Sequence, residues 1–398
     1  MGNSRVGTKG LLVAAALLSA ALVGCSGSSD AGAGKGSSGG GAAGTTTTTI
    51  APDDDLKLNQ IQVIGTHNSF HVEDRPNEMA KLAKLNPGEA LTRQYSHQPL
   101  PTQLGEEKIR QIELDVFADS KGGLYTHPAL AAAGTKVDAA MSKPGTKVLH
   151  EQDVDFHSVC PTLVACLTEV KTWSDANPGH VPVAINIQFK DGPLIFAVPN
   201  QAVPEKWTSS AMDGLDDEIT SVFDRDEIIT PDDVRGDHAT LEEAVLADDW
   251  PTLGESRGKV MFLMINPEPY RSIYLEGHAG LKGRILFTNA VPGEPDASYV
   301  GLDDPLADGA EITDLVAKGY LVRTRADANG VEAKADDTTR LDAALASGAQ
   351  WVSTDYPGPD GAKAQYGTSY VAELPGFLPA RCNPVTAPKG CVDAAVEP

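Results

Sequence analysis

Ile61-Gln-Val-Ile-Gly-Thr-His-Asn-Ser-Phe70 and Ile112-Glu-Leu-Asp-Val-Phe117 are the two most informative segments of this chain. Each is a short run rich in β-branched and apolar residues, which is typical of a buried strand. The first ends in His67 and Asn68, and the second carries Glu113 and Asp115. An acid/base group beside hard oxygen ligands at the end of a strand indicates a metal-assisted phosphoryl site.

Further apolar runs of the same kind continue along the chain. The predicted strands span residues 61–65, 109–117, 146–149, 181–189, 259–265, 284–289, 320–325 and 350–354, and helix-like segments span 163–177, 241–248, 308–318 and 336–347. Parallel strands need helical crossovers, and eight such units close a sheet, so the pattern predicts an α/β fold of the TIM-type (β/α)8 barrel class. The alternative is an open doubly wound sheet, although no Gly-x-Gly-x-x-Gly follows the first strand.

The N-terminal segment has the pattern of an export signal. Arg5 and Lys9 precede an apolar stretch at 11–23, which is about half as long as a membrane-spanning helix. Leu22-Val-Gly-Cys25 resembles a bacterial lipobox, so residues 1–24 are predicted to be a signal peptide and Cys25 to carry a lipid. The alternative is an ordinary signal peptide with an unmodified cysteine. The predicted location is therefore the outer face of the bacterial membrane as a lipoprotein, or the exterior if Cys25 is not lipidated.

The amino-acid composition divides the rest of the chain into three parts. Residues 25–55 are mostly Gly, Ser, Ala and Thr and are predicted to be a flexible tether, residues 56–375 a catalytic barrel domain, and residues 376–398 a Pro-rich surface tail. The chain carries 55 acidic and 32 basic residues, a formal net charge of −23. Such acidity excludes nucleic acid as a partner and argues against electrostatic adhesion to anionic lipids. Contact with a membrane is expected through the anchor, and no protein partner is predicted.

Four cysteines besides Cys25 are expected to form disulfides. Cys160 lies near Cys166 in the sequence, and Cys382 lies near Cys391, so each pair closes a small local loop in an oxidising exterior. Four cysteines allow three pairings, of which this one is favoured by proximity. Zinc is the alternative, but neither pair has the two-residue spacing of a zinc knuckle.

The carboxyl ends of barrel strands converge on one mouth, where side chains with chemical roles are expected. The candidates are His67 and Asn68 after the first strand, Glu113 and Asp115 in the second, His150 after the third, Gln188 and Lys190 at the fourth, and Asp355 with Tyr356 after the last. Glu113 and Asp115 are two residues apart, which places both carboxylates on one side of a strand. Two carboxylates and an amide oxygen suit Ca²⁺. The alternative is a solvated pair on an exposed face.

Three motifs resemble a known family. Gly65-Thr-His-Asn-Ser69, Glu113-Leu-Asp115 and Lys147-Val-Leu-His150 look like those of the calcium-dependent bacterial phosphatidylinositol-specific phospholipase C family, and matching segments run from about residue 58 to 360. The resemblance implies a TIM-barrel phosphodiesterase in which His67 and His150 are the catalytic pair. It also implies one Ca²⁺ ion, with Asn68, Glu113 and Asp115 as ligands and Gln188 where the family commonly has a glutamate.

The resemblance implies a reaction and further contacts. The inositol 2-hydroxyl of a phospholipid at a membrane surface would attack phosphorus and release diacylglycerol. His127 is an alternative second histidine, because it follows Glu113 by 14 residues, a spacing that resembles the arrangement in the eukaryotic phosphoinositide enzymes. Lys190, Asp355 and Tyr356 are expected to contact the substrate, and so is His157. The other histidines are interpreted as structural: His71, His97, His180, His238 and His278.

Two other functions remain open. One is a glycerophosphodiester phosphodiesterase, which the segments 320–327 and 341–357 resemble, although the first strand ends in Thr-His-Asn and not in the His-Arg pair of that family. The other is a surface lipoprotein that binds phosphoinositides without turnover, and Gln188 in place of a glutamate motivates it.

Overall fold

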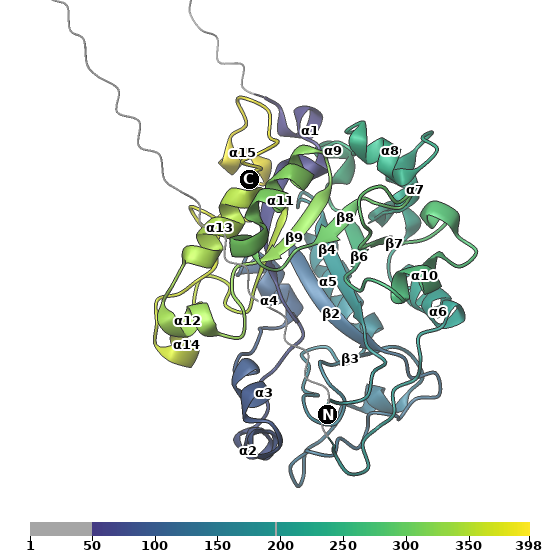
Figure 1. The fold of residues 1–398 in the computed structure, drawn as a ribbon, viewed down its shortest axis with the longest axis vertical. Helices are drawn as coiled ribbons and strands as arrows, with labels where there is room; N and C mark the ends of the chain where they lie inside the picture. The colour runs from purple at the N-terminus through teal and green to yellow at the C-terminus, as the bar shows by residue number, and fades with distance from the viewer. Residues whose placement is uncertain (1–49, 196) are drawn as a thin grey trace, which may run out of the picture. The chain divides into compact units, whose positions relative to one another are not determined.

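Strand β1 (Ile61–Thr66) lies in the middle of a parallel sheet, paired with β10 (Trp351–Thr354) on one side and β2 (Gln111–Phe117) on the other. The computed structural model describes residues 50–195 and 197–398 (Figure 1). The other parallel strands are β4 (Val183–Phe189), β5 (Ile228–Ile229), β6 (Val260–Met264), β7 (Leu286–Thr288), β8 (Tyr299–Gly301) and β9 (Leu321–Arg325). The predicted α/β class with a parallel sheet is therefore confirmed.

The sheet curves toward closure but remains open. Its order is β5-β6-β4-β2-β1-β10-β9-β8, with β7 also paired with β6. Between β7 and β8 the described residues have a single isolated bridge, Asn289 to Tyr299. Both strands are only three residues long, and the loop between them contains Pro292 and Pro295, which cannot donate ladder hydrogen bonds. The complete closure of the predicted barrel is thus not reached.

One predicted barrel strand has a different role. Strand β3 (Lys147–Val148) runs antiparallel to β2 and pairs Val148 with Val116, so it lies beside the mouth and is not a member of the parallel series. A parallel partner of β2 would need a crossover helix, and the segment before β3 has only a short 3-10 turn, η2 (Ala139–Ser142). Strand β4 pairs with β2 directly, and the parallel series includes β5 and β8, which were not predicted. The sequence interpretation missed β8 because Tyr-Val-Gly is too short to show a pattern.

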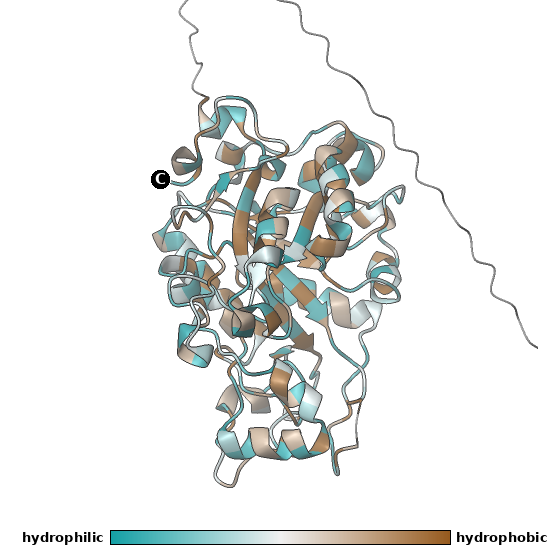
Figure 2. Ribbon diagram, turned by 60° about the vertical axis from the view of Figure 1, so that its left-hand side comes forward, coloured by the Kyte–Doolittle hydropathy of each residue, from teal (hydrophilic) through white to brown (hydrophobic). Residues whose placement is uncertain are grey.

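Helices cover the outer face of the sheet, and the apolar residues of the strands form the core, which appears brown in Figure 2. The predicted helices are present as α5 (Leu163–Ala176), α8 (Leu241–Leu246), α11 (Pro305–Ala317) and α13 (Thr339–Ser347). The others are α2 (Pro76–Leu85), α3 (Pro87–Thr92), α4 (Leu100–Gly105), α6 (Ser209–Thr220), α7 (Pro231–Arg235), α9 (Leu253–Ser256), α10 (Tyr270–Leu275), α12 (Val331–Ala335) and α14 (Lys363–Tyr366). Within residues 50–195 and 197–398, every helix is too short or too polar to cross a membrane.

Both ends of the described chain pack against the start of the sheet. Helix α1 (Pro52–Asp55) contacts α9, and Asp53 bonds to Arg257 at 2.6 Å, so the folded part begins before residue 56. At the other end, β11 (Arg381–Cys382) pairs antiparallel with β1, and helix α15 (Asp393–Val396) follows it. The tail is therefore built into the fold and is not a surface appendage. Disulfides link Cys160 to Cys166 and Cys382 to Cys391.

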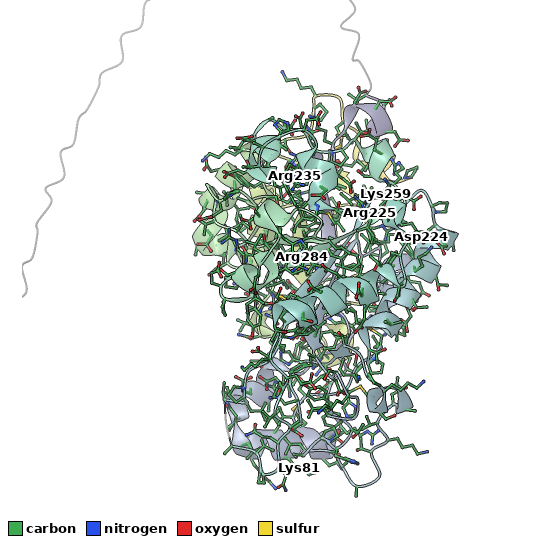
Figure 3. All side chains as sticks on the ribbon, turned by 90° about the vertical axis from the view of Figure 1, so that its right-hand side faces the viewer. Lys81, Asp224, Arg225, Arg235, Lys259 and Arg284 are labelled. Carbon is green, nitrogen blue, oxygen red and sulfur yellow. A yellow bond between two sulfur atoms is a disulfide. The ribbon has the colours of Figure 1, made fainter. Side chains whose placement is uncertain are left out.

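The acidic segment at 213–237 is also folded. It comprises most of α6, strand β5 and α7, and it is held by arginines. Arg284 bonds to Asp213 at 2.5 Å and lies over the ring of Tyr274, whose hydroxyl donates to Asp216. Figure 3 shows Asp224, Arg225, Arg235 and Arg284 on this side of the fold, with Lys81 of α2 at the far end. Because these arginines pair with the acidic side chains, the segment 213–237 can fold despite its negative charge.

Candidate active site

The segment at the end of β1, residues 65–69, is held against β2 by hydrogen bonds of Ser69. Gly65 is required because a Cβ atom there would lie 1.9 Å from Oε1 of Gln111. Asn68 adopts a left-handed conformation with φ of 46°, which asparagine tolerates better than most residues. Ser69 then exchanges two bonds with Glu113: its backbone N–H donates to the Glu113 carbonyl (2.9 Å), and its Oγ accepts from the Glu113 N–H (2.8 Å). The turn therefore places His67 and Asn68 beside Glu113.

His67 is fixed by a carboxylate from the last strand. Its Nδ1 lies 2.7 Å from Oδ1 of Asp355, and its Nε2 lies 3.7 Å from Oε1 of Glu113. Burial and the positive charge of Arg325 lower the pKa of His67, despite the opposing effect of Asp355. Burial alone would raise the pKa of Asp355, but Arg325, 3.0 Å away, and His67 hold it below its usual range. His67 is therefore neutral near pH 7, with its Nδ1–H donated to Asp355.

Glu113 and Asp115 point to the same side of β2, and both are buried. Oε2 of Glu113 accepts from Arg323 at 2.7 Å, while its Oε1 faces His67. Oδ2 of Asp115 lies 3.1 Å from Nζ of Lys190. Burial raises the pKa of Asp115, against the lowering effects of Lys190 and His150. Glu113 therefore lies beside His67, and Asp115 is close enough to His150 for their charges to interact.

The oxygens of this group fit a calcium ion. Within the described part of the chain, Oδ1 of Asn68 and Oδ1 of Asp115 are buried without a hydrogen-bond partner. Buried polar atoms without partners are rare unless they serve a ligand. Gln188 is in register with Asp115 on the adjacent strand, so its amide lies on the same face, and Asn186 is in register with Glu113. Several oxygen donors with two carboxylates are the ligand set that Ca²⁺ prefers.

His150 belongs to a second carboxylate–histidine group. Its Nδ1 lies 2.7 Å from Oδ2 of Asp155, and Oδ1 of the same carboxylate lies 3.0 Å from Nε2 of His71. Burial would raise the pKa of Asp155, but His71 and His150 hold it well below its usual range. The ring of Tyr95 stacks on His71 with 4.3 Å between centroids. Asp155 thus fixes the orientation of His150 in the same manner as Asp355 fixes His67.

The other predicted site residues lie in different surroundings. His127 is exposed and borders a surface groove with Lys81, Lys84 and Leu85. His157 is hydrogen bonded to Glu78 at 2.8 Å, so its imidazole is engaged by a carboxylate, and its contact with substrate stays a prediction.

Asp355 and Tyr356 have protein partners in this structure, and their contact with substrate stays a prediction. Asp355 is the partner of His67. Tyr356 is buried, and its hydroxyl lies 3.2 Å from that of Tyr366.

Several residues of the site escaped the sequence interpretation. They are Asp155 and His71, which support His150; Arg323 and Arg325, which pair with Glu113 and Asp355; and Asn186, whose side-chain atoms are buried without hydrogen-bond partners among residues 50–195 and 197–398. The alternation in Leu321-Val-Arg-Thr-Arg325 was a usable signal, because charged residues two apart on an inner strand share a face. His71 had no such signal, since its partner lies 84 residues away.

A parallel α/β sheet whose strand ends carry two carboxylate-bound histidines around an oxygen cage is the arrangement expected of a metal-assisted phosphodiesterase. The chain belongs to the family of Ca²⁺-dependent phosphoinositide phospholipases C, whose model matches residues 56–384. The family is calcium dependent, which confirms the predicted cofactor.

Two solved structures are similar to this chain. One is a calcium-dependent phosphoinositol-specific phospholipase C from a Gram-negative Pseudomonas species in its apo form, with 16% identity, a TM-score of 0.50, and coverage of 85% of this chain and 99% of that one. The other is a Ca²⁺-dependent phosphatidylinositol-specific phospholipase C from Streptomyces antibioticus, with 17% identity, a TM-score of 0.49, and coverage of 75% and 95%. The first likeness shows a shared fold. None of the curated proteins matches the chain.

Proposed function

We propose that this protein cleaves phosphatidylinositol, or a related inositol phospholipid, into diacylglycerol and a cyclic inositol phosphate by acid–base catalysis between His67 and His150. The observation that carries the proposal is the pair of histidines, each bonded through Nδ1 to a buried carboxylate, with Glu113 3.7 Å from His67 and Asp115 within electrostatic reach of His150. Family membership supports the class of substrate.

His67 is the general base. Because its Nδ1–H is donated to Asp355, the lone pair of Nε2 is directed toward Glu113 and the space at the strand ends. Burial and Arg325 keep the imidazole neutral near pH 7, as a base requires. Nε2 takes the proton of the inositol 2-hydroxyl as that oxygen bonds to phosphorus. Attack from within the same molecule needs no water and gains from proximity.

His150 is the general acid. Asp155 accepts the Nδ1–H of His150 and fixes the orientation of its imidazole ring. As the bond from phosphorus to the glycerol oxygen breaks, His150 gives its proton to that oxygen, so diacylglycerol leaves as a neutral alcohol. The 2-hydroxyl proton stays on His67 until it passes to solvent, and His150 takes a proton back from solvent, which restores both histidines.

Calcium would be held by Asn68, Glu113, Asp115 and Gln188. When bound, it stabilises negative charge on the phosphoryl oxygens. The residues themselves contribute the geometry, because the bonds of Ser69 to Glu113 and the strand register of Asp115 with Gln188 fix their relative positions. Lys190, next to Asp115 and partly exposed, is placed to contact a phosphate. Arg323 holds the second oxygen of Glu113 and keeps its side chain in place.

The test is release of inositol phosphate from phosphatidylinositol vesicles, with and without a calcium chelator. We expect activity in Ca²⁺ that the chelator abolishes and that added Ca²⁺ restores. His150→Ala should lower the rate by about 10²- to 10⁴-fold, the usual contribution of a general acid. His127→Ala, in an exposed histidine, is the matched control and should leave the rate unchanged. Equal losses in the two variants would overturn the assignment of His150.

The choice of substrate separates this activity from that of a glycerophosphodiester phosphodiesterase. Intact phosphatidylinositol should be cleaved faster than glycerophosphoinositol, with diacylglycerol as the lipid product. Preference for the deacylated substrate would reject the phospholipase assignment. Calcium and phosphoinositide binding without any product would instead support the non-catalytic alternative.

We also propose that the protein is exported and anchored by a lipid on Cys25. The signal peptide, Cys25 and residues up to 49 of the tether lie outside the described residues, so the support is the lipobox-like sequence alone. Expression of the full chain in a bacterial host should place the protein in the membrane fraction. Cys25→Ser should move it to the soluble fraction, and an unchanged distribution would contradict the anchor.

A further inference from the structure

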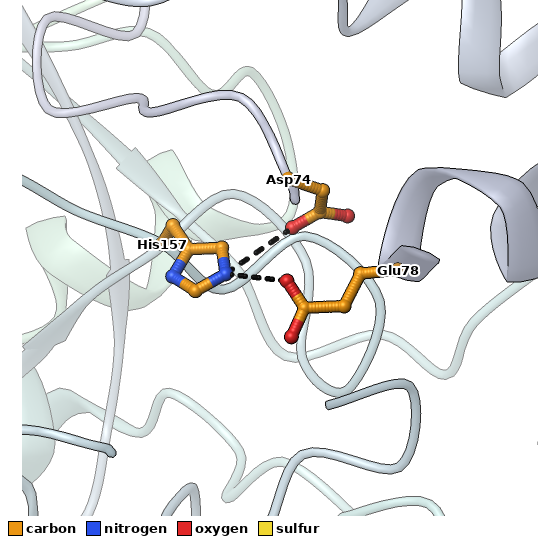
Figure 4. A group of neighbouring side chains, drawn as sticks. All are labelled: Asp74, Glu78 and His157. Carbon is orange, nitrogen blue, oxygen red and sulfur yellow. Dashed lines mark hydrogen bonds and ion pairs between the residues drawn. The ribbon is translucent and has the colours of Figure 1, made fainter. Parts of the chain in front are cut away.

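Three ionisable side chains that take no part in the proposed reaction gather beside the segment that supports His150. They are Asp74, Glu78 and His157, and Figure 4 shows their polar atoms converging. Nε2 of His157 lies 2.8 Å from Oε2 of Glu78 and 3.9 Å from Oδ1 of Asp74. One ligand atom from each residue lies within 4.8 Å of the other two, which is the spacing of donors around a single ion.

Asp74 is the member that hydrogen bonding does not account for. It is only 5% exposed, and within the described part of the chain neither carboxylate oxygen has a hydrogen-bond partner. A buried carboxylate without a partner is costly, so such groups are normally paired or coordinate a metal. Its Oδ1 is directed toward His157, as the dashed line in Figure 4 indicates. A divalent cation between the three residues would give the Asp74 carboxylate the partner that it lacks.

The ligand atoms are already oriented by their neighbours. Oε1 of Glu78 accepts from the backbone N–H of Ala132 at 2.7 Å and from Oγ1 of Thr135 at 2.9 Å. Oε2, which accepts from the backbone N–H of Arg75 at 3.2 Å, faces His157, and supporting hydrogen bonds of this kind are typical of metal ligands. His157 is 19% exposed and borders a surface groove lined in part by Lys136 and Asp138, which gives an ion a route from solvent.

We propose that Asp74, Glu78 and His157 bind a divalent transition-metal ion, for which Zn²⁺ is the best match, at a site separate from the calcium cage. One imidazole nitrogen and two carboxylate oxygens are donors that Zn²⁺ accepts, and a water molecule would complete four-fold coordination. Ca²⁺ prefers six to eight oxygen ligands and is a poor match for three donors that include a nitrogen.

The position of this cluster gives the ion a structural role. His157 follows Asp155 by two residues, and the carbonyl of His157 accepts from the N–H of Val72 at 3.4 Å. Asp155 bonds to both His71 and His150. An ion bound by Asp74, Glu78 and His157 would therefore link the segment 71–78, which carries His71, to the segment 155–157, which carries Asp155. These three residues are positioning residues and do not contact the substrate.

The experiment is a Zn²⁺ titration of the metal-stripped full chain by calorimetry, in saturating Ca²⁺ so that the calcium cage is filled. We expect one Zn²⁺ per chain and a rise in Tm on binding. Asp74→Asn and His157→Gln should each weaken binding by at least about 10-fold, as the loss of a ligand requires. His127→Gln, an exposed histidine outside the cluster, should bind as the parent does. No binding, or equal binding by Asp74→Asn and the parent, would overturn the proposal.

A second measurement guards against a folding defect. Without metal, Asp74→Asn keeps the size of the side chain and should have a Tm close to that of the parent, while the Zn²⁺-induced rise in Tm disappears. A Zn²⁺-induced rise that persists in both variants would place the ion elsewhere and reject the site. Because these readouts are independent of catalysis, they are unaffected by the outcome of the phospholipase assay.

Discussion

Nδ1 of His67 lies 2.7 Å from Oδ1 of Asp355, although 288 residues separate them in the chain. The contact joins the residues that follow β1 and β10, which are neighbouring strands paired at Thr66 and Thr354. Asp355 accepts the Nδ1–H and thereby determines which nitrogen of His67 carries the lone pair. The acid–base state of the site therefore depends on the pairing of the first and last strands of the parallel series.

Asp355→Asn is expected to abolish most activity without disturbing the fold. The asparagine amide can donate to Nδ1, which favours the tautomer with a proton on Nε2 and leaves no base toward the substrate. We expect kcat to fall by about 10²- to 10⁴-fold with little change in KM, the range for loss of a general base. Steady-state kinetics on phosphatidylinositol measures both. Asp54→Asn, an exposed carboxylate in α1, should match the parent. A kcat within a few-fold of the parent in Asp355→Asn would contradict this role.

Gln188→Glu should tighten calcium binding. Gln188 lies in register with Asp115, so a carboxylate there adds a negative charge to the oxygen cage. An extra charge at ligand distance should lower the Ca²⁺ concentration for half-maximal activity by about 10-fold, or about 1.4 kcal/mol. The measurement is activity against free Ca²⁺, with the exposed Gln365→Glu as the control. An unchanged or weaker calcium response would indicate that Gln188 is not a ligand.

Local sequence patterns predicted the strands that have a clear hydrophobic run and a chemical group at the end. The segments of β1, β2, β4 and β10 were located because each combines β-branched and apolar residues, which the core requires, with polar groups toward its end. The antiparallel pairing of β3 could not be foreseen, because the direction of pairing depends on the path of the intervening chain and not on composition. The opening between β7 and β8 likewise depends on tertiary pairing.

The site was predictable where one motif carries both position and chemistry, as in Thr66-His-Asn-Ser69. It was not predictable where the hydrogen-bond or ion-pair partner of a site residue lies far away in the sequence. Asp155 lies five residues from His150 and was within reach, yet its second contact, His71, lies 84 residues away. Arg323 reaches Glu113 across 210 residues. Such pairs are defined by the arrangement of strands, which a single sequence does not display.

Glu107→Gln should stabilise the protein in a pH-dependent manner. Burial, with added repulsion from Asp360 and Glu106, raises the pKa of Glu107 from 4.5 to about 7. Between these two values the unfolded chain ionises while the folded one does not, so the folded state loses stability as pH rises. The variant lacks this loss. The free energy of unfolding of Glu107→Gln should equal that of the parent at pH 4 and exceed it by on the order of 1 to 3 kcal/mol at pH 8.

Urea denaturation at several pH values measures the effect of Glu107→Gln. Glu276→Gln, an exposed glutamate, is the control and should follow the parent at every pH. An advantage that does not change between pH 4 and pH 8 would show that the effect is not one of ionisation.

Glu397→Gln should destabilise the fold while leaving catalysis intact. Oε2 of Glu397 accepts from Nε of Arg110 at 2.9 Å and from the backbone N–H of Val181 at 2.9 Å, and both side chains of the ion pair are at most one-tenth exposed. Arg110 directly precedes β2, at the end of the strand opposite to Asp115, so its surroundings are remote from the reacting groups. Removing one charge of a buried pair leaves the other uncompensated, at a cost of about 2 to 4 kcal/mol in the free energy of unfolding.

Urea denaturation should show this loss with kcat unchanged at 25 °C, whereas Glu311→Gln, at an exposed position, should behave as the parent. Parent-like stability of Glu397→Gln would mean that the tail is held by its strand pairing and disulfide alone.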